Sequence, residues 1–190
     1  MAELLLYHHA QGQTPGFLAF ADELRAAGHT VHAPDLYDGN TFAELDDGVG
    51  YAKQGGFDTI LERGRLAAEG LPNELVYGGF SLGVMPAQML AQTRPGAKGG
   101  LAVQRCLPSL RVRRLVAAGR PAPDPHDGGR RVGAGGSSRS SRARRDDRGR
   151  GAVPVPRDRH LFADSSLPDY DEAAATLLEQ RVLSFLANVA

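Results

Sequence analysis

The sequence contains only one cysteine, Cys106, so it cannot form an intramolecular disulfide or a metal site built from cysteines. It also lacks any continuous apolar run of about 18 residues, which argues against a membrane-spanning helix. The first residues lack the basic stretch of a signal peptide and become polar at His8. Together, these absences predict a cytoplasmic protein without a membrane partner.

The chain has 190 residues, a length that favours one domain with its own core, spanning residues 1–190. Its formal charge of zero hides an uneven distribution. Residues 104–157 hold 14 of the 22 basic residues, all of them arginine, against four aspartates, a net of +10 that leaves −10 for the remainder. Residues 137–151 show no periodic spacing of apolar residues. We therefore expect residues 104–157, the anomalous middle segment, to be disordered or disrupted.

Outside that segment, apolar runs typical of buried strands alternate with stretches of helical periodicity. Strands are predicted at about 3–9, 29–33, 75–77 and 100–103, and helices at about 14–28, 42–53, 57–70, 82–91 and from 167 to the C-terminus. Such alternation predicts a mostly parallel sheet with helices on both faces, and ligands bound beyond the carboxyl ends of the strands.

The most informative stretch is Gly79-Phe80-Ser81-Leu82-Gly83, which fits the G-x-S-x-G pattern between a predicted strand and a predicted helix. In such a turn the serine has a strained backbone, and the flanking glycines prevent collisions with neighbouring elements. The N–H of Leu82 would then point to the place where an oxyanion forms. The alternative is a glycine-rich turn that contains a serine by coincidence.

Four stretches together resemble the dienelactone hydrolase family of α/β-hydrolases, over roughly residues 2–103 and 158–188. They are His8-His9-Ala10-Gln11-Gly12, Pro34-Asp35-Leu36-Tyr37, the Ser81 motif, and His160-Leu161-Phe162 followed by Tyr170 and Ala173-Ala174. The resemblance implies an α/β-hydrolase-like fold and a nucleophile, an acid and a base in that chain order. Ser81 would be the nucleophile and His160 the base. The best-known members use cysteine at the nucleophile position, so an ordinary serine esterase fits this sequence equally well.

The backbone around Ala10 and Gln11 lies where such hydrolases have their second oxyanion donor. Gln11 could instead be an ordinary polar loop residue. His8 and His9 could be read as a metal pair, but adjacent strand residues face opposite sides of a sheet, so we expect no metal site there. Asp35 is interpreted as a turn residue rather than a residue of the pocket.

The acid expected between the strand at 100–103 and His160 falls in the arginine-rich segment, where Asp124 and Asp127 are the candidates. Read one base later, the codons for 151–156 permit Glu-Leu-Phe-Leu-Tyr-Pro, a credible strand leading into His160. We therefore expect residues 104–157 to be translated out of frame, which would remove the acid of the family. Its loss typically lowers turnover about 10⁴-fold.

The predicted function is hydrolysis of a small carboxylic ester or lactone through Ser81, with neither metal nor organic cofactor required. The alternative is an inactive remnant, or a basic binding module that uses the arginine-rich segment. Residues 104–157 contain no aromatic side chains for base stacking, so we expect no nucleic-acid partner. The oligomeric state stays open.

Overall fold

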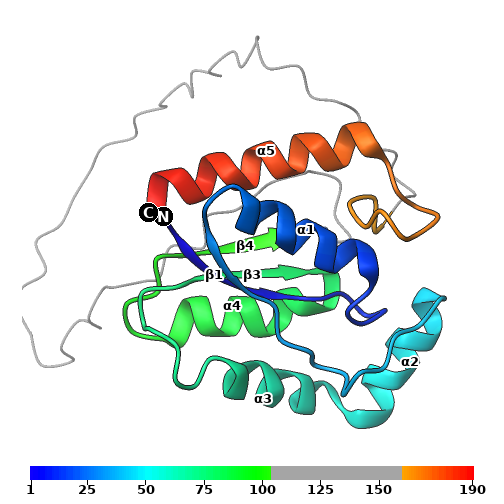
Figure 1. The fold of residues 1–190 in the computed structure, drawn as a ribbon. Helices are drawn as coiled ribbons and strands as arrows, with labels where there is room; N and C mark the ends of the chain where they lie inside the picture. The colour runs from blue at the N-terminus through cyan, green and yellow to red at the C-terminus, as the bar shows by residue number, and fades with distance from the viewer. Residues whose placement is uncertain (104–159) are drawn as a thin grey trace, which may run out of the picture. The chain divides into compact units, whose positions relative to one another are not determined.

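The computed structural model describes residues 1–103 and 160–190; the anomalous segment at 104–157 lies outside the described residues. The described chain has an α/β fold (Figure 1). Its strands are β1 (Glu3–Tyr7), β2 (Thr30–His32), β3 (Val76–Phe80) and β4 (Gly99–Val103). Its helices are α1 (Pro15–Ala26), α2 (Leu45–Gly55), α3 (Phe57–Ala67), the short 3₁₀ turn η1 (Ser81–Gly83), α4 (Val84–Thr93) and α5 (Glu172–Val189).

The four described strands are all parallel and lie in the order β2-β1-β3-β4. Leu5 of β1 pairs with His32 of β2 on one side and with Tyr77 of β3 on the other. In a doubly wound sheet, ligands bind beyond the carboxyl ends of the strands where the strand order reverses. Here the reversal lies between β1 and β3, so their carboxyl ends are the place to look for a site.

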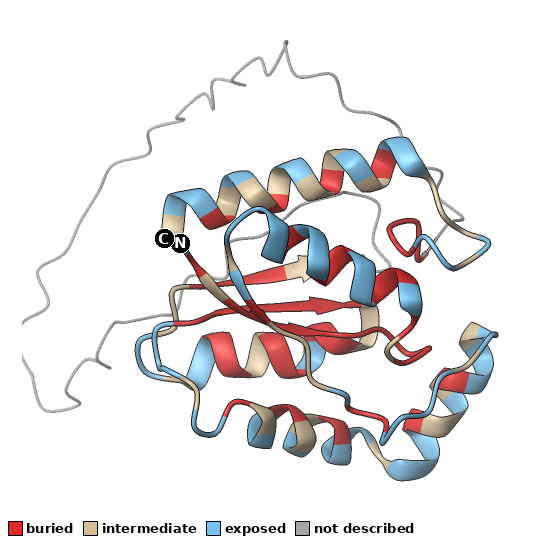
Figure 2. Cartoon of the chain, viewed as in Figure 1, coloured by how far each residue is buried: buried red, intermediate tan, exposed pale blue. Residues whose placement is uncertain are grey.

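Successive residues of β1 point to opposite faces of the sheet, and each face has its own apolar layer. Leu4 and Leu6 pack in one core cluster with side chains of α1 and α5. Leu5 and Tyr7 pack in the other with side chains of α2, α3 and α4. Figures 1 and 2 show these helices on the two sides of the sheet, in which β1, β3 and β4 are mostly buried. The predicted parallel sheet with helices on both faces is therefore confirmed.

Local signals at the helix ends are visible in the structure. Thr14 caps α1 by accepting a hydrogen bond from the Phe17 N–H, and Pro15 occupies the first helical position, where its missing N–H costs nothing. Gly28 follows α1 with a φ of +90° and ends it. Asp171 caps α5 by accepting from Ala174 N–H.

Strand boundaries differ from those predicted. β1 ends at Tyr7, so His8 and His9 belong to the loop after the strand rather than to the strand itself. β3 continues to Phe80, three residues beyond the predicted end, because Gly78 and Gly79 pair with β1 and β4 despite having no side chains to favour a strand. A 3₁₀ turn then separates β3 from α4. The sheet therefore extends right up to Ser81.

Within residues 1–103 and 160–190, no helix has the length and apolar character needed to cross a bilayer.

Two helical glycines allow a matched test of the packing between α3 and α4. A Cβ added to Gly64 of α3 would collide with Pro86 of α4, whereas a Cβ added to Gly50 of α2 would meet nothing within 4 Å. Both Gly→Ala changes gain about 1 kcal/mol of helix propensity. We expect Gly50→Ala to raise the free energy of unfolding by up to that amount, and Gly64→Ala to lower it by about 1–3 kcal/mol through overpacking. Urea denaturation measures both, and equal effects would contradict the tight α3–α4 contact.

Candidate active site

Ser81 lies at the sharp turn that follows β3, with a backbone conformation that is rare for a residue with a side chain. Its φ is +46°, in the left-handed region where Cβ crowds the backbone. Such strain persists only where the surroundings enforce it, and it is frequent at functional sites. The turn thus has the backbone that a G-x-S-x-G nucleophile requires.

The glycines on either side of Ser81 make this turn sterically feasible. A Cβ on Gly79 would collide with the carbonyl oxygen of Gly83, so the turn can close only without one. A Cβ on Gly83 would lie 2.5 Å from the carbonyl oxygens of Tyr7 and His8, at the end of β1. The two glycines therefore let the serine turn close tightly and pack directly against the neighbouring strand.

The structure brings Ser81 together with His160, although they are 79 residues apart in the sequence. Ser81 Oγ lies 2.7 Å from His160 Nε2, a normal length for a hydrogen bond between a hydroxyl and an imidazole. In the tautomer with its proton on Nδ1, His160 accepts the hydrogen bond from the serine hydroxyl at Nε2. A nucleophile and a general base need this geometry.

The surroundings of His160 favour its neutral form. Burial lowers the pKa of His160 below its ordinary value of 6.5; the Asp169 carboxylate opposes this shift, and the nearby His9 adds to it. Asp169 also accepts a hydrogen bond from the His160 backbone N–H, at 3.2 Å. At neutral pH the imidazole is therefore unprotonated and able to accept a proton from Ser81.

The predicted oxyanion donors have different surroundings. Leu82 is the second residue of the 3₁₀ turn that leads into α4, and N–H groups in the first turn of a helix lack intrahelical acceptors. The backbone N–H of Gln11, by contrast, donates to His9 Nδ1 at 3.2 Å, and the Gln11 side chain donates to carbonyl oxygens of Phe42 and Ala43. The Gln11 N–H that was expected to bind the oxyanion is therefore already hydrogen-bonded to His9. The oxyanion roles of Gln11, Ala10 and Leu82 stay predictions.

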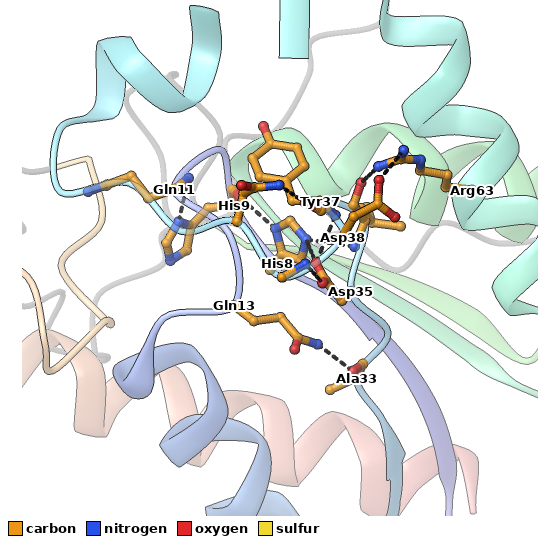
Figure 3. Close-up of polar contacts among 12 residues, drawn as sticks. His8, His9, Gln11, Gln13, Ala33, Asp35, Tyr37, Asp38 and Arg63 are labelled. Carbon is orange, nitrogen blue, oxygen red and sulfur yellow. Dashed lines mark hydrogen bonds and ion pairs between the residues drawn. The ribbon is translucent and has the colours of Figure 1, made fainter. Parts of the chain in front are cut away.

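His8 joins the loops that follow β1 and β2. Its Nε2 accepts a hydrogen bond from the Leu36 N–H at 2.9 Å, and its Nδ1 donates to the His9 carbonyl oxygen at 2.7 Å (Figure 3). The ring is fully buried and packs edge-on against Tyr37. Burial lowers the pKa of His8 to about 4, despite the Asp35 carboxylate 3.6 Å away.

Asp35 accepts hydrogen bonds from the backbone N–H groups of Tyr37 and Gly39, as its interpretation as a turn residue predicts. The Tyr37 side chain is buried, and its hydroxyl donates to the Gly48 carbonyl oxygen at 3.1 Å. Both residues therefore shape the loop after β2 (Figure 3).

Sequence reasoning missed one feature of the site, a buried hydrogen bond between the side chains of His9 and Asp164. His9 Nε2 lies 2.8 Å from Asp164 Oδ2, and both side chains are almost completely inaccessible. Burial by itself would raise the pKa of Asp164, but hydrogen bonds from His9, Ser166 and Thr14 outweigh it and lower that pKa to about 2. The local signal was Asp164-Ser165-Ser166, in which Ser166 bonds back to the aspartate.

The predicted acid residues cannot be placed at the site, because Asp124 and Asp127 lie outside the described residues. For the same reason, the proposed change of reading frame stays a prediction. In the part of the chain that the structure describes, three or more histidine, cysteine, aspartate or glutamate side chains never come together as a metal site would require.

No family model and no curated protein matches the chain. Among solved structures, it is similar to the crystal structure of a protein from Xanthomonas campestris pv. campestris, described there as a candidate hydrolase of the alpha/beta superfamily. The two share 24% sequence identity with a TM-score of 0.37, over 62% of this chain and 66% of that one. This chain thus spans just under two thirds of that protein's length, and a similarity of this size assigns neither family nor activity.

The buried His8 predicts a specific dependence of stability on pH. Its pKa falls from 6.5 in the unfolded chain to about 4 in the fold, so the unfolded chain binds the proton first as the pH drops. The stabilisation is complete above pH 6.5 and is lost as the pH falls towards 4. It amounts to about 3 kcal/mol over that window.

Urea unfolding at pH 7, 5.5 and 4 measures this loss, and His8→Gln should remove most of it by taking away the titrating group. Parallel pH profiles for the wild type and His8→Gln would contradict the assignment.

Proposed function

We propose that this protein is a hydrolase of carboxylic esters or lactones, with Ser81 as the nucleophile and His160 as the general base. The observation that carries the proposal is the 2.7 Å contact between Ser81 Oγ and His160 Nε2. The left-handed backbone at Ser81, with a φ of +46°, supports it independently. Their position beyond the carboxyl end of β3, beside the reversal of strand order, is where ligands bind in such sheets.

The proposed reaction has two stages. In the first, Ser81 Oγ forms a bond to the carbonyl carbon of the substrate while its proton passes to His160 Nε2. The tetrahedral intermediate then collapses, and the leaving alkoxide takes the proton from His160. In the second stage, water bonds to the acyl carbon as it loses a proton to His160. The bond from that carbon to Ser81 Oγ then breaks, His160 returns the proton to Ser81 Oγ, and the carboxylic acid leaves.

The developing oxyanion needs donors fixed in advance, and each one is typically worth about 10²- to 10³-fold in turnover. We assign this role to the Leu82 N–H at the start of the helical segment and to the backbone around Ala10 and Gln11. For Gln11 the assignment requires its N–H to leave His9 Nδ1 when substrate binds.

The lactone half of the proposed substrate class comes from the resemblance to dienelactone hydrolases. Serine in place of the cysteine of the best-known members favours ordinary esters equally. Comparing the hydrolysis of an open-chain phenyl ester with that of an aromatic lactone would separate the two. Asp124 and Asp127 stay the candidate acids. The alternative of a basic binding module depends on residues 104–157, outside the described residues.

A fluorophosphonate probe tests the nucleophile directly, because it forms a covalent bond only with an activated serine. We expect the full-length chain to be labelled at Ser81, and Ser81→Ala to abolish the labelling. Ser184→Ala, which changes an exposed serine on α5, is the matched control and should label like the wild type. A folded wild-type chain that the probe does not label would overturn the proposed function.

The rate of labelling should also report the state of His160. Because burial lowers the pKa of His160, the neutral base is present down to below pH 6.5. We expect the rate to rise with pH through a midpoint below 6.5 and then to level off. His160→Ala should lower the plateau by about 10²- to 10⁴-fold. A profile with the same midpoint in His160→Ala would show that another group is the base.

A further inference from the structure

Asp164 is a buried carboxylate four residues after His160, and it contacts three separate parts of the site. Its Oδ2 lies 2.8 Å from His9 Nε2 and accepts a short hydrogen bond from the Thr14 hydroxyl. Its Oδ1 accepts from the Ser166 N–H at 2.9 Å and from the Ser166 hydroxyl at 2.6 Å. One side chain thus joins the loop after β1, the start of α1 and the segment that carries His160.

The charge of Asp164 suits this position because the carboxylate lies at the N-terminus of α1. A Cβ on Gly16, the second residue of α1, would collide with Asp164 Oδ1, so the carboxylate lies directly against the first turn. The Gly16 N–H donates to the Ser166 hydroxyl at 3.1 Å, and that hydroxyl in turn donates to Asp164. The positive end of the helix dipole therefore stabilises the ionised form.

The proton on His9 can be located from its partners. The Gln11 backbone N–H donates to His9 Nδ1, so this nitrogen is an acceptor and carries no proton. His9 Nε2 therefore carries the proton and donates it to Asp164. Through one imidazole, the loop that holds Gln11 is linked to the segment that holds His160.

From this geometry we infer that Asp164 is a positioning residue, which holds the His160 segment against the β1 loop and the start of α1 so that His160 Nε2 reaches Ser81 Oγ. The inference rests on the proposed function, because it assigns Asp164 a task in the Ser81–His160 pair. Asp164 touches neither the substrate nor the reacting atoms in this role.

The segment that carries His160 is anchored to the rest of the fold by the apolar packing of Phe162 and Ala163 in the core and by polar contacts, among which those of Asp164 are central to the inference. Among the described residues, 160–171 contain neither helix nor strand, so the backbone hydrogen bonds of a regular element do not hold this segment. Several of its backbone hydrogen bonds are internal, such as the one from Asp171 N–H to the Phe162 carbonyl oxygen. The carboxylate of Asp164 provides polar contacts from this segment to the rest of the fold.

An amide cannot replace this carboxylate. Both oxygens of Asp164 act as acceptors for two donors each, from His9, Thr14 and the two groups of Ser166. Asparagine has one acceptor oxygen and one NH₂ group, so Asp164→Asn turns a donor towards one of the two pairs of donors. The contact on that side is lost, and the His160 segment is no longer fixed from both sides.

The position of His160 can be measured without any turnover. Ser81→Cys places a thiol next to the His160 imidazole, and a neighbouring imidazolium lowers a thiol pKa well below its usual value of about 8.5. The pH dependence of alkylation by iodoacetamide gives this pKa, and peptide mass spectrometry separates the new thiol from Cys106. His160→Ala in the same background gives the thiol pKa without the imidazole.

Adding Asp164→Asn to Ser81→Cys should raise the thiol pKa by about one unit towards 8.5, which is about tenfold slower alkylation at pH 6. Ser166→Ala, which removes one of the four hydrogen bonds to Asp164 together with the one from the Gly16 N–H, should raise it by a smaller amount. The matched control is Asp22→Asn, an exposed carboxylate on α1 that pairs with Arg25, and it should leave the thiol pKa unchanged. Circular dichroism verifies that each variant is folded.

The possible results distinguish a failure of the Asp164 positioning role from a failure of the proposed hydrolase function. A thiol pKa that responds to His160→Ala but to neither Asp164→Asn nor Ser166→Ala overturns the positioning role and leaves the proposed function intact. A thiol pKa that ignores His160→Ala removes the Ser81–His160 pair, and the proposed function fails with it. If Asp164→Asn does not fold, Ser166→Ala decides the matter, and an unchanged thiol pKa in that variant overturns the inference.

Discussion

The candidate active site depends on the hydrogen bond between the Ser81 hydroxyl and the His160 imidazole. One end is fixed by the sheet, because β3 leads directly to Ser81 and Gly83 packs against the end of β1. The other end belongs to residues 160–171, the described residues ahead of α5, which form neither helix nor strand. Because the sheet fixes the position of Ser81, the distance between Ser81 Oγ and His160 Nε2 depends mainly on the contacts that hold His160 in place.

Much of the architecture could be predicted from the sequence, because apolar periodicity and helix caps are local signals. The parallel sheet and the approximate span of α1 followed from them, and the structure confirms the α/β fold. The ends of β1 and β3 were misplaced for a physical reason: pairing across the sheet decides where a strand stops. Gly78 and Gly79 have low strand preference, yet neighbouring strands on both sides hold them in β3.

The site could be predicted only where local pattern and chain order sufficed. Five consecutive residues, 79–83, were enough to predict the turn around Ser81. In the structure His160 lies next to this turn. The pair of His9 and Asp164 spans 155 residues and matches no spacing rule, so the local signal at Asp164-Ser165-Ser166 could not identify His9 as its partner. The hydrogen bond from the Gln11 N–H to His9 Nδ1 joins residues only two apart; it could not be predicted because it depends on the conformation of the loop after β1.

The left-handed backbone at Ser81 restricts which side chains this position can accept. A β-branched residue is a genuine outlier at positive φ, because its second γ atom adds to the crowding that glycines on both sides already relieve. Threonine is therefore closed to this position although it carries the same hydroxyl. Cysteine, with an unbranched side chain of similar shape, is open to it. The fold thus permits the hydroxyl at this position to be replaced by a thiol through one substitution, but disfavours its replacement by the hydroxyl of threonine.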